Sequence, residues 1–409
     1  MMRGFVRWAL VPLMRLWASV IELRMTGVPR PTDAPQAHSA GLDSDRILVV
    51  GSGPAVGWGV LSHDLALPGS LARALSGRTG RGTDVDVLSR SGMTVSSLPD
   101  AVYELKLRRY DAVVITLGAN DAAYLTSLRL WRRRLSRVLC ILEKDSSRTT
   151  HIFVVGIHPF RSFGGLDKVL GWVIDRHART LNRATAGICA ESPRASFVPL
   201  LAAPNHAPDR FQTPEGYRFW AELMADRMSG VLDTEHRKPE STTDDPVIDA
   251  AGLEVDRQWA VDGLGILDTM PEDRFDTIVT LAKHVFGTSG AAFSVIDNDR
   301  LWQMANAGGG PKETPRNRSF SAVTIQGTGP MVVRDALADE RFRDNALMQG
   351  ETRTRFYAGY PVESPSGQRI GALCVFDPLP GSMDNFDQVL LRELALMVQG
   401  ELWQRPDAA

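Results

Sequence analysis

The stretch Ile47–Val60 reads ILVVGSGPAVGWGV and decides the fold of the first half of the chain. It begins with a short apolar β-branched run and breaks at a Gly-Ser-Gly turn, which predicts a buried strand that ends at a loop. Similar apolar runs follow at 85–88, 112–117, 152–157 and 197–201. Helical patterns separate them at 61–75, 99–108, 125–143, 166–189 and 214–232. Alternating strands and helices predict an α/β fold with a parallel sheet that helices cover on both faces.

The second half of the chain has a different pattern. Residues 28–44 read as a loop, and residues 233–250 are polar and without periodicity, which is typical of a linker. After the linker we expect helices at 255–264, 274–286 and 387–403, and strands at 291–297, 331–335, 356–362 and 370–376. This order predicts an α+β domain with an antiparallel sheet.

Length and composition agree with two folded domains. The chain has 409 residues, and about 100–200 residues per domain give two or three domains. The apolar fraction of 44% and the charged fraction of 23% exclude a wholly disordered, collagen-like or coiled-coil chain. Three cysteines that are far apart in sequence support neither a disulfide framework nor a cysteine zinc site.

The net charge of −2 is the sum of a positive first half and a negative second half of the chain. Residues 251–409 carry −7 and residues 1–250 carry +5, of which +4 lies in residues 1–31. The rest of the first half is almost neutral by this count, so we expect no broad basic face for nucleic acid.

Residues 5–21, FVRWALVPLMRLWASVI, form an apolar N-terminal segment that arginines and a proline interrupt. The charges make it a poor transmembrane helix and a weak signal peptide. Arginine and tryptophan at helical spacing fit an amphipathic helix on an anionic membrane surface. The alternative is a helix that packs on its own domain or on a partner protein.

Four short motifs follow one another along the first half of the chain. The GSG turn at 51–53 is followed by Ser91-Gly92, by Gly118-Ala119-Asn120-Asp121, and by Asp209-Arg210-Phe211-Gln212 with a trailing Gly216-Tyr217. Residues 44–232 therefore resemble the SGNH (GDSL-type) hydrolases. The resemblance implies a flavodoxin-like three-layer fold with a site at the carboxyl edge of the sheet.

The resemblance also shows where the catalytic residues are missing. It places the serine nucleophile at Gly53 and the histidine base at Gln212, and neither side chain can do that chemistry. The oxyanion donors Gly92 and Asn120 are kept, as is Asp209. We therefore expect an inactive hydrolase domain that still binds a carboxylate or an ester carbonyl.

An active enzyme is the alternative interpretation. Ser52 stands one position before the expected nucleophile, and His206 stands three positions before Asp209. If both shifted into place, the protein would be a lipolytic esterase or acyltransferase. If the two residues do not shift into these positions, Ser52 caps a helix and His206 is a solvated loop residue. A scaffold that binds no small molecule is a third interpretation.

The second half resembles a GAF domain of the bacterial sensory type over residues 253–403. The matching segments are LGILDTMPEDRFD at 264–276, DNDRLW at 297–302, VVRDALADERFRDN at 332–345 and FYAGYPVESPSGQRIGALCVFD at 356–377. The resemblance implies a regulatory module that binds a small molecule and supports a homodimer. Our pocket candidates are Trp302, Phe320, Arg355 and Tyr357, with a core role as the alternative for the aromatic residues.

The departures from the GAF pattern argue against some chemistry. The family often has Ser-Phe-Cys-Ala where this chain has Ser319-Phe320-Ser321-Ala322, so redox chemistry or chromophore attachment is not expected there. We expect no metal and no cofactor. The sequence thus predicts a cytoplasmic sensing protein that binds a small-molecule ligand or an acyl ester, with a GAF homodimer and a membrane contact through residues 5–21 as further hypotheses. Binding through that segment would place the protein at the inner membrane face.

Overall fold

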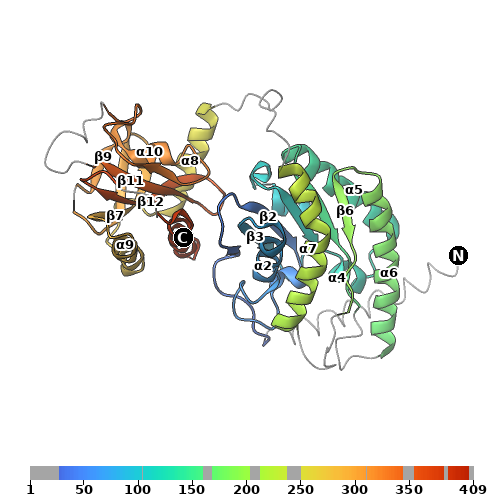
Figure 1. Cartoon of the computed structure of the whole chain (residues 1–409). Helices are drawn as coiled ribbons and strands as arrows, with labels where there is room; N and C mark the ends of the chain where they lie inside the picture. Colours follow the sequence, from blue (N-terminus) through green and yellow to red (C-terminus); the bar gives the residue numbers. More distant parts are fainter. Residues whose placement is uncertain are drawn as a thin grey trace. The chain divides into compact units, whose positions relative to one another are not determined.

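The computed structural model describes residues 27–103, 105–159, 168–202, 212–236, 250–309, 311–343, 354–381 and 386–404. The chain divides into two compact units, Met1–Glu240 and Ser241–Ala409, each built around its own six-stranded sheet (Figure 1). The segment 5–21 lies outside the described residues, as do His206 and Asp209.

The first unit has a mixed sheet in the strand order β1-β3-β2-β4-β5-β6. Its strands are β1 Gln36–Ser39, β2 Asp45–Gly51, β3 Thr83–Ser89, β4 Ala112–Thr116, β5 His151–Val155 and β6 Ala195–Val198. Strands β2 to β6 are parallel, and β1 pairs with β3 in the antiparallel direction. The prediction of an α/β fold with an essentially parallel sheet is confirmed.

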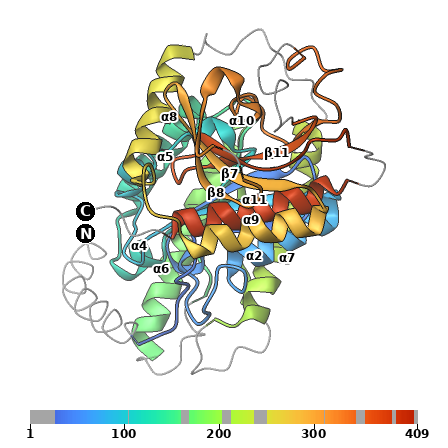
Figure 2. The same cartoon turned by 90° about the vertical axis from the view of Figure 1, so that its left-hand side faces the viewer.

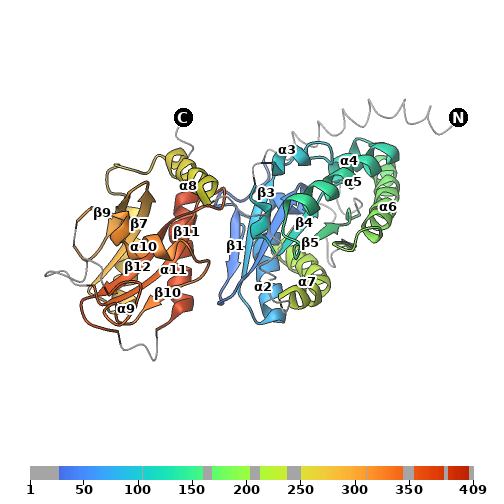
Figure 3. The same ribbon diagram turned by 90° about the horizontal axis from the view of Figure 1, so that it is seen from above.

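Helices cover both faces of this sheet (Figure 3). They are η1 Gly53–Val56, α2 Leu67–Thr79, α3 Leu98–Val102, η2 Leu107–Arg109, α4 Ala119–Ala123, α5 Leu128–Asp145, α6 Lys168–Ala190 and α7 Pro214–His236. One core lies between the sheet and α2 and α7, and the other lies between the sheet and α3, α5 and α6. The result is a three-layer unit.

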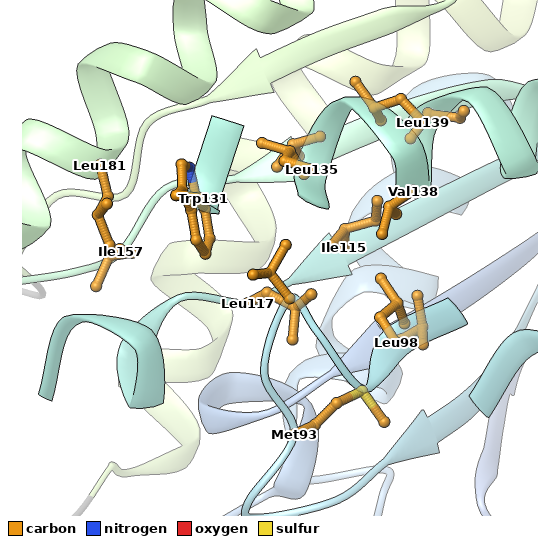
Figure 4. Close-up of a cluster of buried hydrophobic side chains, with 14 of the residues drawn as sticks. Met93, Leu98, Ile115, Leu117, Trp131, Leu135, Val138, Leu139, Ile157 and Leu181 are labelled. Atoms are coloured by element: carbon orange, nitrogen blue, oxygen red, sulfur yellow. The ribbon is translucent and has the colours of Figure 1, made fainter. Parts of the chain in front are cut away.

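The core under α5 and α6 contains a large tryptophan (Figure 4). Trp131 of α5 is 2% exposed, and its indole N–H donates to Thr185 Oγ1 of α6 at 3.1 Å. Leu135 and Leu142, on the same side of α5, are fully buried. The polar end of the tryptophan is therefore satisfied inside an otherwise apolar layer, and the contact fixes α5 against α6.

Two parts of the sequence prediction were wrong. The segment expected to be a loop at 28–44 contains β1, whose Ala37 is buried opposite Val85. A four-residue edge strand with polar neighbours has too short an alternation to be recognised. The expected helix at 61–75 begins only at Leu67, where Pro68 occupies the first turn of α2.

Arg81 ties three elements of the first unit together. Its guanidinium contacts Asp45 at the start of β2 at 2.9 Å and Asp233 near the end of α7 at 2.8 Å. The Asp45 side chain is 2% exposed, so the pair is shielded from water. Removing one partner of such a buried pair leaves an uncompensated charge and is strongly destabilising.

The second unit has an antiparallel sheet in the order β10-β11-β12-β7-β8-β9. Its strands are β7 Gly290–Asp297, β8 Arg300–Asn306, β9 Glu313–Pro315, β10 Met331–Val333, β11 Phe356–Glu363 and β12 Arg369–Asp377. Its helices are α8 Ala250–Leu264, α9 Asp273–Phe286, η4 Arg316–Arg318, α10 Phe320–Thr324 and α11 Gln388–Trp403. The prediction of an α+β unit is confirmed, although β8, β9 and α10 were not foreseen.

The two faces of the second sheet differ. Helices α9 and α11 lie side by side on one face, where they form the main core together with α8 (Figure 2). The short helix α10 lies on the other face over a smaller aromatic cluster. Among the helices that the structure describes, none combines the length and the apolar character that crossing a bilayer requires.

Candidate functional site

The turn after β2 is fixed by a close approach to β4. A Cβ at Gly51 would lie 2.2 Å from the Thr116 carbonyl oxygen, so only glycine fits. Next in the chain, the Ser52 N–H donates to that same oxygen at 2.8 Å. Gly53, with φ of 60°, then begins the 3-10 helix η1. The turn is therefore held rigidly at the carboxyl edge of the sheet.

Gly53 occupies the position that the resemblance gives to the nucleophile. It lies between β2 and β4, where the strand order reverses and α/β folds bind their ligands. A Cβ built at Gly53 meets Cβ of Ala119 at 3.9 Å and no nearer atom. There is room for a side chain at this position, but none is present.

Ser52, the alternative nucleophile, faces the protein interior. Its side chain is 1% exposed, and its Oγ has no hydrogen-bond partner among the described residues. Its backbone is extended, with φ of −136° and ψ of −173°. In this conformation a substrate in solution does not reach the hydroxyl.

Asn120 holds two motifs together at the same edge. Its Nδ2 donates to the carbonyl oxygens of Ser91 at 2.7 Å and Met93 at 2.9 Å. An amide nitrogen has two hydrogens, so both donors are used in this conformation. Gly92, the other expected donor, lies exposed within the turn that Asn120 holds.

Asp121 stabilises the same turn through hydrogen bonds. Its side chain is 1% exposed and accepts hydrogen bonds from the Val95 N–H and from Thr126 Oγ1, both at 3.1 Å. Burial raises the pKa of this carboxyl above its ordinary value. These contacts give Asp121 a structural role in joining the 91–95 segment to α4.

Gln212, at the expected base position, is buried at the start of α7. It is 9% exposed, and its Nε2 has no hydrogen-bond partner among the described residues. The side chain lies over Gly216, where a Cβ would come within 2.6 Å of Nε2. The glycine that follows the base position thus makes space for the glutamine amide.

Three histidines of the first unit lie outside the four motifs, and the structure shows their surroundings. His158 packs on Trp220 with ring centroids 5.0 Å apart, and His177 Nε2 lies 2.8 Å from the Thr126 carbonyl oxygen. His63 Nδ1 lies 2.7 Å from the Asp33 carboxylate, an Asp–His pair that no sequence signal marks. No hydrogen bond between described residues joins these histidines to Ser52.

The four GAF pocket candidates do not gather at one site. Trp302 pairs with Val295 and therefore shares the sheet face of α9 and α11. Phe320 and Tyr357 lie on the opposite face, where their rings stack at 4.8 Å. Arg355 precedes β11 and forms an ion pair with Asp335, which lowers the pKa of that carboxyl.

The Phe320–Tyr357 cluster is filled by its own contacts. The Tyr357 hydroxyl shares hydrogen bonds with Ser321 Oγ at 3.2 Å and Thr324 Oγ1 at 3.0 Å. Cys374 is buried beside it, and burial raises the pKa of the thiol to about 12. A thiol in this state is a poor nucleophile at neutral pH.

A separate hollow of about 540 Å³ lies outside this cluster. It is lined by Asp299, Pro315, Arg316, Asn317, Ser319, Ala322, Val323 and Gln326. None of our four pocket candidates lines it, so motif reasoning missed this part of the GAF surface. Among the described residues, no cluster of His, Cys, Asp and Glu is arranged to hold a metal ion.

Comparisons with known proteins fit these two architectures. The family model for the GDSL-like lipase/acylhydrolase family matches residues 50–219, and the model for the GAF domain matches residues 270–402. A cyclic di-GMP phosphodiesterase of Pseudomonas aeruginosa is 40% identical over 147 residues, which are 36% of this chain. The chain spans only 25% of that relative.

Two solved structures also resemble parts of the chain. An extracellular lipase from Streptomyces rimosus is 15% identical over 47% of this chain and 100% of its own, with a TM-score of 0.32. The GAF domain of an Acinetobacter phosphoenolpyruvate-protein phosphotransferase is 15% identical over 37% of this chain and 90% of its own, with a TM-score of 0.26. Residues 50–219 form a GDSL-like lipase/acylhydrolase domain, and residues 270–402 form a GAF domain.

Proposed function

We propose that this chain is a ligand-binding regulatory protein whose GDSL-like domain does not hydrolyse esters. The observation that carries the proposal is the turn at the carboxyl edge of the sheet. Gly53 stands at the nucleophile position without a side chain, and the neighbouring Ser52 hydroxyl is buried. An ester bond cannot be attacked without an accessible nucleophile.

The surroundings of the turn support the same conclusion. An active serine needs a base to take its proton, and Gln212 is an amide without basicity near neutral pH. An oxyanion hole needs free donors, and both Asn120 Nδ2 hydrogens are given to backbone carbonyls. The nucleophile and base positions thus lack the required groups, and the Asn120 oxyanion donor is engaged.

The space at Gly53 supports a binding role instead. It lies at the strand reversal and borders Ala119, with the exposed Gly92 turn nearby in the family arrangement. A carboxylate or an ester carbonyl is the ligand class that the remaining polar groups suit. We place this domain at about residues 44–232 and the GAF domain at about 253–403.

The GAF domain supports a signalling setting. A relative that is 40% identical over 147 residues is a cyclic di-GMP phosphodiesterase, which is a signalling enzyme by its name. We propose that the GAF domain here binds a small regulatory molecule and forms a homodimer. Its output then goes through the GDSL-like domain or through another protein.

The test is an activity assay on the full chain. Purified protein is incubated with short-chain p-nitrophenyl esters and with a fluorophosphonate probe, alongside Ser52→Ala and Ser91→Ala. The exposed Ser91 of the neighbouring turn is the matched control for loss of a hydroxyl. We expect no turnover and no labelling in any of the three proteins.

Turnover or labelling that Ser52→Ala abolishes and Ser91→Ala preserves would overturn the proposal. It would establish the alternative of a GAF-regulated esterase with Ser52 as a displaced nucleophile. The binding role is tested separately by the melting temperature in the presence of short-chain carboxylates. A ligand that binds only the native state must raise it.

A further inference from the structure

A row of exposed arginines runs along α5 and α6 of the GDSL-like domain. We call it the arginine strip, and it consists of Arg129, Arg132, Arg133 and Arg137 on α5 and Arg176, Arg179 and Arg183 on α6. All of these side chains are exposed. None forms an ion pair with an acidic residue in the part of the chain that the structure describes.

The two helices present the strip as one surface. Both lie on the same side of the sheet, opposite α2 and α7 (Figure 3). Trp131 bonds to Thr185, and His177 bonds to the loop before α5 at Thr126, so α6 extends beyond the start of α5. At 1.5 Å per residue the arginines cover roughly 12 Å of α5 and roughly 10 Å of α6, so the strip is roughly 20 Å long.

Acidic side chains are kept away from the strip. The α5 sequence from Leu128 to Leu142 contains none, and its acids Glu143 and Asp145 come only in the last turn. On α6, Asp175 is buried and 3% exposed. By contrast, α7 on the other face mixes Glu215, Glu222 and Asp226 with its arginines.

Apolar groups are exposed among these arginines. Trp172, near the start of α6, is 45% exposed, and the Arg176 guanidinium lies 5.5 Å from its ring centroid. Leu130, beside Arg129, is 40% exposed. Tryptophan and leucine next to arginine are typical of a surface that lies at the boundary between lipid headgroups and acyl chains.

We propose that the arginine strip docks the GDSL-like domain on an anionic lipid surface. Guanidinium groups bind headgroup phosphates through paired hydrogen bonds, and Trp172 and Leu130 enter the interface between them. The strip does not include residues 5–21, for which the sequence alone suggested a membrane contact. Nucleic acid carries the same phosphate chemistry, but the exposed apolar groups favour lipid.

The test uses the full chain and lipid vesicles. Binding is measured by co-sedimentation with phosphatidylcholine vesicles that contain or lack a third of phosphatidylglycerol. The strip variant carries Arg129→Glu, Arg133→Glu and Arg176→Glu. The control variant carries Arg73→Glu, Arg218→Glu and Arg227→Glu, which makes the same change in charge on the exposed surfaces of α2 and α7. Circular dichroism confirms that both variants are folded.

We expect binding to anionic vesicles only, weakened roughly tenfold or more in the strip variant and much less in the control. Trp172→Ser should also weaken binding, because it removes the interfacial ring and leaves the charge unchanged. Absence of vesicle binding would overturn the proposal, and so would equal binding by the strip and control variants. A strip-dependent affinity for an RNA or DNA oligonucleotide, without vesicle binding, would assign the surface to nucleic acid instead.

Discussion

Gly53 and Ala119 face each other across the carboxyl ends of β2 and β4, and a Cβ built on Gly53 would lie 3.9 Å from Cβ of Ala119. That distance is ordinary van der Waals contact, so the nucleophile position has lost its side chain while its surroundings still allow one. Two positions earlier, Gly51 has no such room, because a Cβ there would come within 2.2 Å of a backbone oxygen.

This contrast predicts different outcomes for two serine substitutions. Gly53→Ser should cost only about 1 kcal/mol, from the left-handed backbone at φ of 60°. Gly51→Ser should cost about 3 kcal/mol or more, since the strand itself must move. Urea unfolding of both variants measures the difference. Equal losses of stability would show that the turn is not packed against β4 as described.

Asn120 should stabilise the fold through its hold on the 91–93 turn. Asn120→Ala removes both donors and should lower the free energy of unfolding by about 1–2 kcal/mol. Asn120→Asp should lower it further, because a carboxylate would face two carbonyl oxygens. The exposed Asn317 provides the control, and its substitution by Ala or Asp should change little. An Asn120→Asp variant as stable as wild type would contradict this geometry.

The GAF domain should lose stability in acid through Glu254. Hydrogen bonds from Arg257 and then Arg316 lower the pKa of this carboxyl from 4.5 to about 2. The unfolded chain therefore binds more protons between these values, and the stabilisation, present above about pH 4.5, is lost as the pH falls toward about 2. Glu254→Gln should flatten that part of the stability profile, measured by urea unfolding.

The control for this pH dependence is Glu340→Gln, which removes a carboxyl that is 86% exposed. It should leave the acid limb of the profile as in wild type. If Glu254→Gln and Glu340→Gln have the same profile, the Glu254 network does not contribute to acid stability.

The three cysteines should react at very different rates. Cys140 is exposed, whereas burial raises the pKa of Cys189 to about 11 and that of Cys374 to about 12. Iodoacetamide at about pH 8 should therefore alkylate only Cys140 in the native protein, because thiolates are the reactive form. Mass spectrometry of native and urea-unfolded samples measures this, and Cys140→Ser should abolish the native-state labelling. Rapid native labelling of Cys374 would contradict its placement in the core.

The layers of both domains could be predicted because their strands are continuous apolar runs. Strands such as Ile47–Val50 and Phe356–Val362 bury nearly every residue, and that pattern is visible without a structure. Strand β1 could not be predicted, because a four-residue edge strand has one buried side chain, Ala37. Whether Trp302 lies on the same sheet face as Tyr357 depends on strand register, which the motifs do not give.

The motifs located the GDSL-like site but not its hydrogen bonds. They gave the positions of Gly53 and Asn120, yet the acceptors of Asn120 are backbone carbonyls whose directions only the folded turn determines. The distribution of charge on the surface could not be predicted from the sequence either. A sum over the first half of the chain predicted a nearly neutral domain, whereas folding gathers the arginines of α5 and α6 on one side and hides Asp175.

The ion pairs of Arg81 define the smallest piece of the first domain that should fold alone. The GDSL-like match ends at residue 219, but Arg81 also requires Asp233, which lies four turns further along α7 at about 3.6 residues per turn. At the other end, β1 begins at Gln36, before the match starts at residue 50. A fragment cut at the limits of family similarity would therefore lose β1 and most of β2, and it would leave the Arg81 guanidinium without Asp45 and without Asp233. A fragment that runs from before Gln36 to beyond Asp233 keeps both.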